Sequence, residues 1–324
     1  MKAALAVAVV CGAAQGARAG TPRNTPAAIE VDRDAAPAGR VGFGFDGGEP
    51  IEAWGASLAL GWIERPIALG AGAFGDGTPA SRPVRRRETL TLGGALALGD
   101  SVVVDAAIRA SHQVGDRLHA AGDPAGLTRT VFHDVRLGAR IRVAGDRDRA
   151  ALLRGDLTLP SGNDDELAGD ARWTVAWRLI GRLTLDRVVV AANVGIRLHG
   201  AEVQVADHLV GDELFAAAGA AVPLAALNVA APVTVTGELL GALGDHVGKL
   251  SAPSPIEARL GAIVQLAPAL ALGAHVGAGL VDEIGAPRFR ALLELAWTPP
   301  VERRATPPEP EPESDSDSDS ESGD

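Results

Sequence analysis

The chain has 324 residues, with 30 Lys and Arg against 41 Asp and Glu, which gives a formal net charge of −11. This acidic balance, without a basic stripe, argues against a nucleic-acid-binding protein. One Cys excludes a disulfide framework, and a hydrophobic fraction of 47% excludes a chain that is disordered throughout.

The N-terminus has the features of an export signal. Lys2 supplies a positive charge, residues 3–10 are apolar, and Ala17-Arg18-Ala19 has the small-x-small pattern of a cleavage site. The apolar run is too short to span a membrane as a helix. We therefore predict a cleaved signal peptide at residues 1–19 and a disordered N-terminal segment at residues 20–39.

The central part, residues 40–298, is dominated by strict alternation of apolar and polar residues. In Trp173–Leu185 the odd positions are apolar or Gly, and in Val188–Leu198 the even positions are apolar. Asp186-Arg187 joins the two runs, as in a β-hairpin. The same pattern recurs in further runs: Ile51–Ile63, Thr89–Leu98, Val102–Ala110, Val135–Val143, Ala151–Leu159, Leu214–Val222, Val233–Leu243, Ile256–Leu266, Leu270–Leu280 and Arg288–Trp297.

Strands of about ten residues, joined alternately by short turns and long polar loops, are typical of a transmembrane β-barrel. We therefore predict an all-β, up-and-down antiparallel barrel in the outer membrane. Closure needs an even number of strands. The number is twelve if Ile51–Ile63 runs on as one strand, and fourteen if Glu64-Arg65-Pro66 is a turn and Val41–Phe45 a first strand.

Two stretches are also long and uncharged enough for membrane helices, Leu214–Gly237 and Leu260–Val281. Pro223, Pro232 and Pro268 interrupt them near the places where the barrel interpretation needs turns. The flanking Gly and β-branched residues also favour strands.

The charges of the strands lie on one face. In a soluble sandwich this face would meet water, whereas in a membrane barrel it lines the lumen. The export signal, the uncharged apolar face and the aromatic spacing favour the barrel. Trp54 and Trp62 are eight residues apart, as are Phe289 and Trp297, which corresponds to a rise of roughly 20 Å across an apolar band. Ten arginines are predicted to face the lumen, against six acids: Arg109, Arg136, Arg140, Arg142, Arg154, Arg178, Arg182, Arg197, Arg259 and Arg290, and Asp105, Asp134, Asp156, Glu238, Glu257 and Glu294.

Several loop segments resemble those of a known family. Leu159–Asp164 with Ala168-Gly169-Asp170, Val210–Leu214 and Gly285–Arg290 are similar to segments in the N-terminal barrel of OmpA-family outer-membrane proteins. The resemblance covers roughly residues 40–298 and implies an outer-membrane barrel. The family's C-terminal peptidoglycan-binding domain has no counterpart here, so peptidoglycan binding is unsupported.

Residues 299–324 differ in character, being rich in Pro and then acidic, with eight acids and no base between Glu309 and Asp324. We predict a disordered tail, on the periplasmic side. A second acidic run lies in a long loop and consists of Asn163, Asp164, Asp165, Glu166 and Asp170. This loop is either simply solvated or a site for a cation that bridges lipopolysaccharide.

No motif indicates an enzyme. Two G-x-G-x-x-G matches, at Gly42–Gly47 and Gly70–Gly75, do not open a helix after a strand, as phosphate binding requires. The seven His lack metal-ligand spacing, and no nucleophile–His pair is evident. We predict no cofactor and no metal.

Two functional hypotheses follow. Unpaired lumen arginines would make a passive pore for small solutes with an anion preference. A ladder of Arg–carboxylate pairs would instead close the lumen of a structural envelope barrel. Outer-membrane lipids or lipopolysaccharide are the partners expected in either case.

Overall fold

The computed structural model describes residues 42–51, 53–69, 81–115, 127–163, 167–169, 172–200, 203–205, 208–244, 254–281 and 285–299. The predicted signal peptide, the segment 20–39 and all of the acidic tail beyond Pro299 lie outside these ranges.

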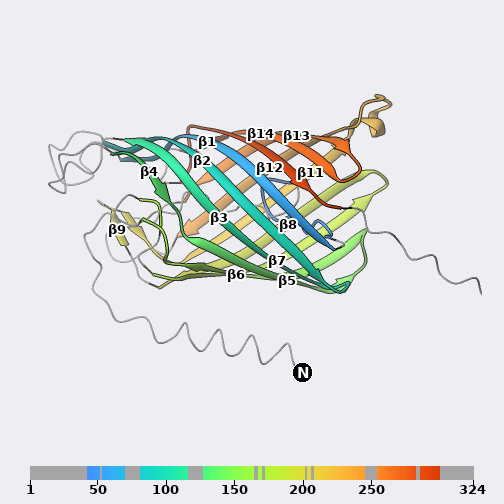
Figure 1. Ribbon diagram of the computed structural model, residues 1–324, viewed down its shortest axis with the longest axis horizontal. Coiled ribbons are helices and arrows are strands. Elements are labelled where there is room, and N and C mark those ends of the chain that lie inside the picture. Colours follow the sequence, from blue (N-terminus) through green and yellow to red (C-terminus); the bar gives the residue numbers. More distant parts are fainter. Residues whose placement is uncertain are drawn as a thin grey trace, which may run out of the picture.

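The described strands close into a twelve-stranded antiparallel barrel, seen from the side in Figure 1. The N-terminal strand pairs with the C-terminal one, and each other wall strand pairs with its neighbours in sequence. The wall consists of β1 (Trp54–Leu69), β2 (Ser81–Leu98), β3 (Val102–Gly115), β4 (Leu127–Phe132) with β5 (Val135–Gly145), β6 (Arg149–Leu159), β7 (Thr174–Leu185), β8 (Val188–His199), β11 (Glu213–Pro223), β12 (Val233–Gly244), β13 (Ile256–Ala267), β14 (Leu270–Gly279) and β15 (Phe289–Trp297).

β4 and β5 together fill one place in the wall. Both pair with β3, β4 with its second half and β5 with its first, and the chain between them is interrupted at His133 and Asp134. The smaller elements are a hairpin of β9 (Val203–Val205) and β10 (His208–Val210), and the short helix η4 (Leu224–Leu227) after β11. The strands β4, β9 and β10 were not predicted, because their runs of six and three residues are too short to show a period.

The predicted hairpins are confirmed. β7 and β8 meet at Asp186-Arg187, where Asp186 has a positive φ of 53°. At the turn between β5 and β6, the backbone N–H groups of Arg149 and Asp148 donate to Asp146 Oδ1 and lower the pKa of this exposed carboxyl. The two stretches considered as membrane helices form β11 with β12 and β13 with β14. Among the described residues, no helix has the length and apolar character needed to cross a membrane.

The alternative count of fourteen strands is wrong. Arg65 does not begin a turn: β1 continues through it to Leu69, with φ 51° at Arg65 and a shift in register before Ile67. The strand therefore accommodates Pro66 through a local irregularity in its pairing, and the chain does not reverse direction there. The described part of the predicted first strand, residues 42–45, is not a strand at all.

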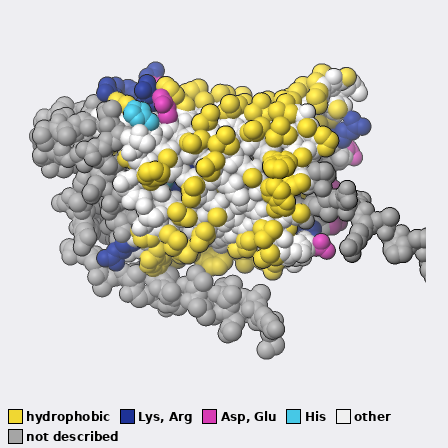
Figure 2. All heavy atoms as spheres, viewed as in Figure 1, with side chains coloured by type: hydrophobic (Ala, Val, Ile, Leu, Met, Phe, Trp, Pro, Cys, Tyr) yellow, Lys and Arg dark blue, Asp and Glu magenta, His cyan; other side chains and the backbone are white. Residues whose placement is uncertain are grey.

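The outside of the barrel is apolar. Figure 2 shows hydrophobic side chains over the visible wall, with charged side chains gathered toward the two ends. Trp54 and Trp297 meet edge to face at the short-turn end, with ring centroids 5.1 Å apart. Trp62 and Phe289 lie exposed toward the long-loop end. These positions are those expected of aromatic residues at the two borders of an apolar band.

Candidate functional site

The centre of the lumen is filled by the chain itself. Residues 42–51, which precede β1 and which we call the plug, run inside the barrel. Phe43, Phe45 and Asp46 are at most 2% exposed, and Glu49 and Ile51 are also buried. The sequence interpretation placed this stretch in the wall or before it. Its four Gly among residues 42–48 and its isolated acids gave no strand period, and nothing in the sequence located it in the lumen.

Apolar contacts hold the plug against the wall at two points. The rings of Phe43 and Phe45 stack at 4.9 Å and pack on apolar wall residues of β8, β11 and β12. Gly219 makes room for them, because a Cβ there would lie 3.0 Å from both rings. Ile51 packs with Ala95 and Val103 beside the β2–β3 turn. The plug therefore joins β1 at the short-turn end of the barrel.

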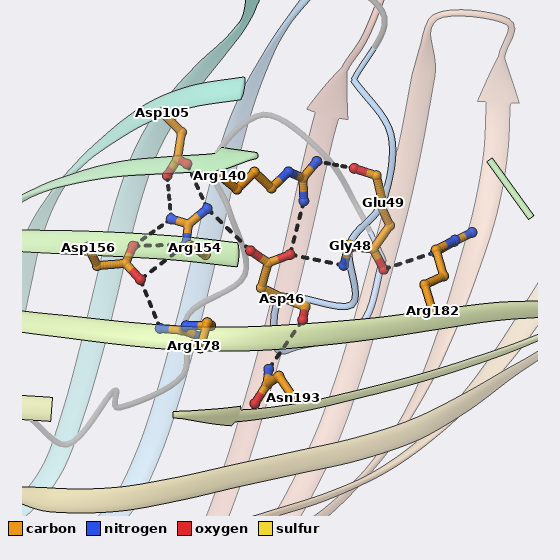
Figure 3. Close-up of polar contacts among 10 residues, drawn as sticks. All are labelled: Asp46, Gly48, Glu49, Asp105, Arg140, Arg154, Asp156, Arg178, Arg182 and Asn193. Carbon is orange, nitrogen blue, oxygen red and sulfur yellow. Dashed lines mark hydrogen bonds and ion pairs between the residues drawn. The ribbon is translucent and has the colours of Figure 1, made fainter. Parts of the chain in front are cut away.

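Asp46 is the polar centre of the plug (Figure 3). Its Oδ1 accepts hydrogen bonds from Arg140 Nη1 and from the backbone N–H of Gly48, both at 3.0 Å, and its Oδ2 lies 3.2 Å from Arg154 Nη1. Asn193 on β8 donates to its backbone oxygen at 3.2 Å. A fully buried carboxylate is tolerated here because two guanidinium groups compensate its charge.

The other plug contacts reach both sides of the lumen. Arg140 Nη2 donates to the carbonyl oxygen of Glu49, and the Glu49 carboxylate lies 3.9 Å from Arg182. On the opposite side, the N–H of Gly44 donates to Glu238 at 2.9 Å, and Arg259 donates to the Gly44 carbonyl at 3.1 Å. The plug thus offers carboxylates to arginines and a peptide N–H to a glutamate.

The ten predicted lumen arginines lie on the inner face of the strands, although Arg142 sits at the turn end. Arg142 donates to the carbonyl of Asp100 in the neighbouring turn and is partly exposed. Arg136 and Arg182 are half-buried. The other seven are buried: Arg109, Arg140, Arg154, Arg178, Arg197, Arg259 and Arg290.

Arg154 is held by two wall aspartates. Its two Nη atoms donate to Asp105 at 2.8 and 2.9 Å, and its Nε and Nη2 donate to Asp156 at 3.0 and 2.6 Å. Asp156 also accepts from Arg178 at 3.0 Å (Figure 3). Gly138 on β5 leaves the space for this cluster, since a Cβ there would lie 2.2 Å from Arg154 Nη2.

A second group of pairs lies across the lumen. Arg259 and Arg290 donate to Glu257 at 2.7 and 2.8 Å, and Arg197 donates to Glu213. Arg178 and Arg197 also lie over the Phe215 ring, at 4.9 and 5.3 Å from its centroid. Glu213 was not among the predicted lumen acids, because the predicted strand began one residue later.

Apart from Arg87 on β2, which is buried and donates to Gln113 on β3, the described charged side chains on the inner faces of the strands are divided between two walls. The basic wall, the inner faces of β3, β5, β6 and β7, carries seven arginines and two aspartates; the acidic wall, the inner faces of β8 and β11–β15, carries three arginines and four glutamates. Their formal charges are therefore 7 − 2 = +5 and 3 − 4 = −1. The plug lies between them and adds two carboxylates, both directed at basic-wall arginines.

The acidic loop is only partly described. Asn163 Oδ1 accepts the N–H of Phe132 at 2.8 Å, so this side chain closes the free edge of β4. Asp164, Asp165, Glu166 and Asp170 lie outside the described residues. Within the described ranges, no three His, Cys, Asp or Glu side chains form a group that could hold a metal ion.

The structure brings together one Ser–His pair that the sequence analysis did not find. Ser111 Oγ lies 2.6 Å from His133 Nε2 and 2.8 Å from Thr89 Oγ1, in a chain across β2, β3 and the interruption before β5. Ser111 and His133 are 2% and 5% exposed. This burial suits a structural role, in which the pair satisfies polar groups where the ladder between β3 and β5 is interrupted.

No family model matches the chain, and no curated protein matches its sequence. Among solved structures, the COG4313 outer membrane channel from Pseudomonas putida F1 superposes with a TM-score of 0.57 and 14% identity, covering 80% of this chain and 99% of that one. The NanC porin and the KdgM porin give TM-scores of 0.47 and 0.44, with 5% and 8% identity; they cover 76% and 75% of this chain, and 100% and 98% of their own. The first likeness shows that this chain shares the barrel fold of that outer membrane channel.

Proposed function

We propose that this protein is a non-enzymatic outer-membrane barrel that passes small hydrophilic solutes, and that the plug closes its lumen in the state described here. The apolar exterior with aromatic borders supports a bilayer location. The charged inner walls support a lumen suited to polar solutes rather than to lipid. Twelve strands also enclose more space than side chains alone fill.

The observation that carries this proposal is how the lumen is closed. The centre of the lumen is occupied by the ten-residue plug, which is not part of the barrel wall and is held by non-covalent contacts. Among the described residues, both hydrogen-bond acceptors of Arg140 lie on the plug. A barrel that closed its own lumen would supply these acceptors from the wall, as it does for Arg154.

The plug combines features of the two hypotheses from the sequence, the passive pore and the structural barrel with a closed lumen. Arg–carboxylate pairs are present, as the closed-barrel hypothesis expects, but the final closure depends on a segment that can leave without breaking a strand. The net positive charge of the basic wall favours anions once the plug is displaced.

Further predictions from the sequence belong to this proposal. We place the short turns on the periplasmic side, the export signal at residues 1–19, and lipids or lipopolysaccharide around the apolar exterior. A relationship to OmpA-family barrels rests on the loop segments alone. The tail and the acidic loop are proposed contacts for cations in the envelope.

The test is conductance in planar bilayers, with the complete mature chain compared with a variant lacking residues 42–51. The complete chain should give small or rare steps, and the variant large and stable steps with a reversal potential that indicates anion preference. Heat-modifiable gel mobility establishes that both are folded barrels. A folded variant without steps contradicts the pore, and a cation preference contradicts the anion selectivity.

A further inference from the structure

The position occupied by Asp46 has the geometry of a carboxylate-binding site. Arg140 and the N–H of Gly48 donate to one oxygen, while Arg154 approaches the other at 3.2 Å. The carboxylate and both guanidinium groups are almost completely buried. Two arginines on the two oxygens of one carboxylate make charge-assisted contacts that are stronger than neutral hydrogen bonds. We call the Arg140 and Arg154 side chains the seat.

Half of the seat is held in place by the wall. Asp105 and Asp156 fix the Arg154 guanidinium through hydrogen bonds of 2.6 to 3.1 Å. This orientation does not depend on the plug, so Arg154 is already aligned for a carboxylate when Asp46 leaves. Binding to groups that are preorganised costs less conformational entropy than binding to mobile ones.

The other half of the seat depends on what fills the lumen. Arg140 contacts acceptors of the plug, Asp46 Oδ1 and the Glu49 carbonyl. Around the seat, β5, β6 and β7 present Arg136, Arg140, Arg154 and Arg178, against Asp105 and Asp156 from β3 and β6. Without Asp46 this cluster has four positive and two negative charges. A buried excess of this kind favours an anion in the same position.

We infer that the seat is a binding site for the carboxylate of a small solute, and that Asp46 is a built-in competitor for it. The inference deepens the proposed function and rests on it for its biological meaning, because it names the class of solute that would displace the plug. The Asp46 carboxylate supplies the shape of the ligand: a planar group with two oxygens and one negative charge.

Asp46→Ala provides a direct test, because it removes only the carboxylate and leaves a space that matches formate. We expect sodium formate to raise the thermal unfolding midpoint of the purified Asp46→Ala barrel in detergent, in a dose-dependent way. Sodium chloride at equal ionic strength, and the neutral formamide, should not reproduce the shift. Formate should bind this variant roughly tenfold or more tightly than the wild type, whose seat is filled.

Two further variants establish the site. Asp46→Asn keeps the space filled and should respond to formate no more than the wild type does. Adding Arg140→Gln to Asp46→Ala should abolish the formate shift. The variant lacking residues 42–51, in which every strand is intact, repeats the test if Asp46→Ala does not yield a folded barrel.

The outcome is separable from that of the pore experiment, because binding is measured without flow. Equal responses of Asp46→Ala to formate, chloride and formamide overturn the carboxylate site even if the plug-free barrel conducts. A specific formate shift that persists after Arg140→Gln overturns the assignment to this seat. A formate shift that requires Arg140 supports the inference, and it does so even in a barrel that carries no current.

Discussion

The two walls of the lumen solve the problem of buried charge in different ways. On the acidic wall, Glu257 is shared by Arg259 and Arg290, and Glu213 is paired with Arg197, so the wall is close to neutral by itself. On the basic wall, Asp105 and Asp156 accept hydrogen bonds from Arg154, and Asp156 also accepts one from Arg178, but Arg140 and Arg182 contact acidic residues of the plug. Charge balance inside this barrel is therefore achieved by wall and plug together.

This difference indicates that the charge balance of the basic wall depends on whether the plug is present. Loss of the plug would expose little uncompensated charge on the acidic wall, since the hydrogen bonds described between this wall and the plug involve plug backbone groups, namely the Gly44 N–H and the Gly44 and Asp46 carbonyls. The same loss would remove two carboxylates from the basic wall. Substitutions on the two walls should therefore differ both in the property that they change and in the size of that change.

The largest effect is expected from Arg154→Leu. It leaves Asp46, Asp105 and Asp156 buried without the guanidinium they share, and removing one partner of a buried ion pair costs about 3–5 kcal/mol. Urea unfolding of the barrel in lipid vesicles should show this loss. Arg142→Leu is the matched control, because Arg142 is partly exposed and donates to a turn carbonyl at the end of the barrel, and it should change stability by less than about 1 kcal/mol. Equal losses would mean that the Arg154 cluster is not a stabilising centre.

The next largest effect is expected from Gly48→Ala, which changes the plug and leaves the strands unchanged. Gly48 has φ +75°, and a Cβ there would lie 2.8 Å from a Leu152 methyl group. The positive φ costs about 1–2 kcal/mol for a residue with a Cβ, and the clash adds to it. Gly99→Ala has nearly the same φ, +74°, but open space around the Cβ. Conductance should rise for Gly48→Ala alone; a similar rise for both variants would mean that plug packing is not the cause.

A third prediction concerns selectivity in the barrel without residues 42–51. Replacing Arg140 and Arg182 by Glu should reverse the anion preference, with a change in permeability ratio of about tenfold, because lumen charge sets local ion concentration. The matched change on the acidic wall, Arg197 and Arg290 to Glu, removes arginines that already have wall carboxylates and should shift the ratio less. Reversal potentials in a salt gradient measure both. Equal shifts would remove the distinction between the walls.

The smallest effect is expected on the acidic wall from Glu238→Gln. The amide oxygen still accepts the Gly44 N–H, so plug occupancy should change by less than about 1 kcal/mol. Glu238→Ala leaves that buried N–H without an acceptor and should cost about 1–3 kcal/mol. Protection of the Gly44 amide from hydrogen exchange reports the difference. Loss of protection in Glu238→Gln would show that the negative charge itself holds the plug.

The barrel was predictable because alternation over a dozen runs is a repeated signal, and each run needed only two-residue turns such as Asp186-Arg187 to fix its direction. The inner position of Arg154 or Arg259 follows from the same period. The partners of those arginines did not follow, since pairing depends on register between strands and on which wall faces which. Glu213 was missed because it lies one residue outside the predicted run.

The plug could not be predicted for a physical reason. Its position depends on complementarity to a cavity that exists only after twelve strands have closed, and residues 42–48 contain glycines that suit many conformations. Asp46 among them has no periodic partner, so it was not recognised as a lumen residue. The interruption at His133 and Asp134 is similar, because its hydrogen bonds reach Ser111 on the neighbouring strand and Ser161 in the loop after β6.

The attachment of residues 42–51 to β1 has a kinetic consequence. Only residues 52 and 53 separate Ile51 from the first strand, so a released segment stays tethered at one mouth of the barrel and cannot diffuse away. Rebinding is then intramolecular, with an effective concentration on the order of millimolar for so short a linker. A soluble competitor has to exceed this local concentration, which sets a threshold for external opening and makes reclosure independent of how many copies the membrane holds.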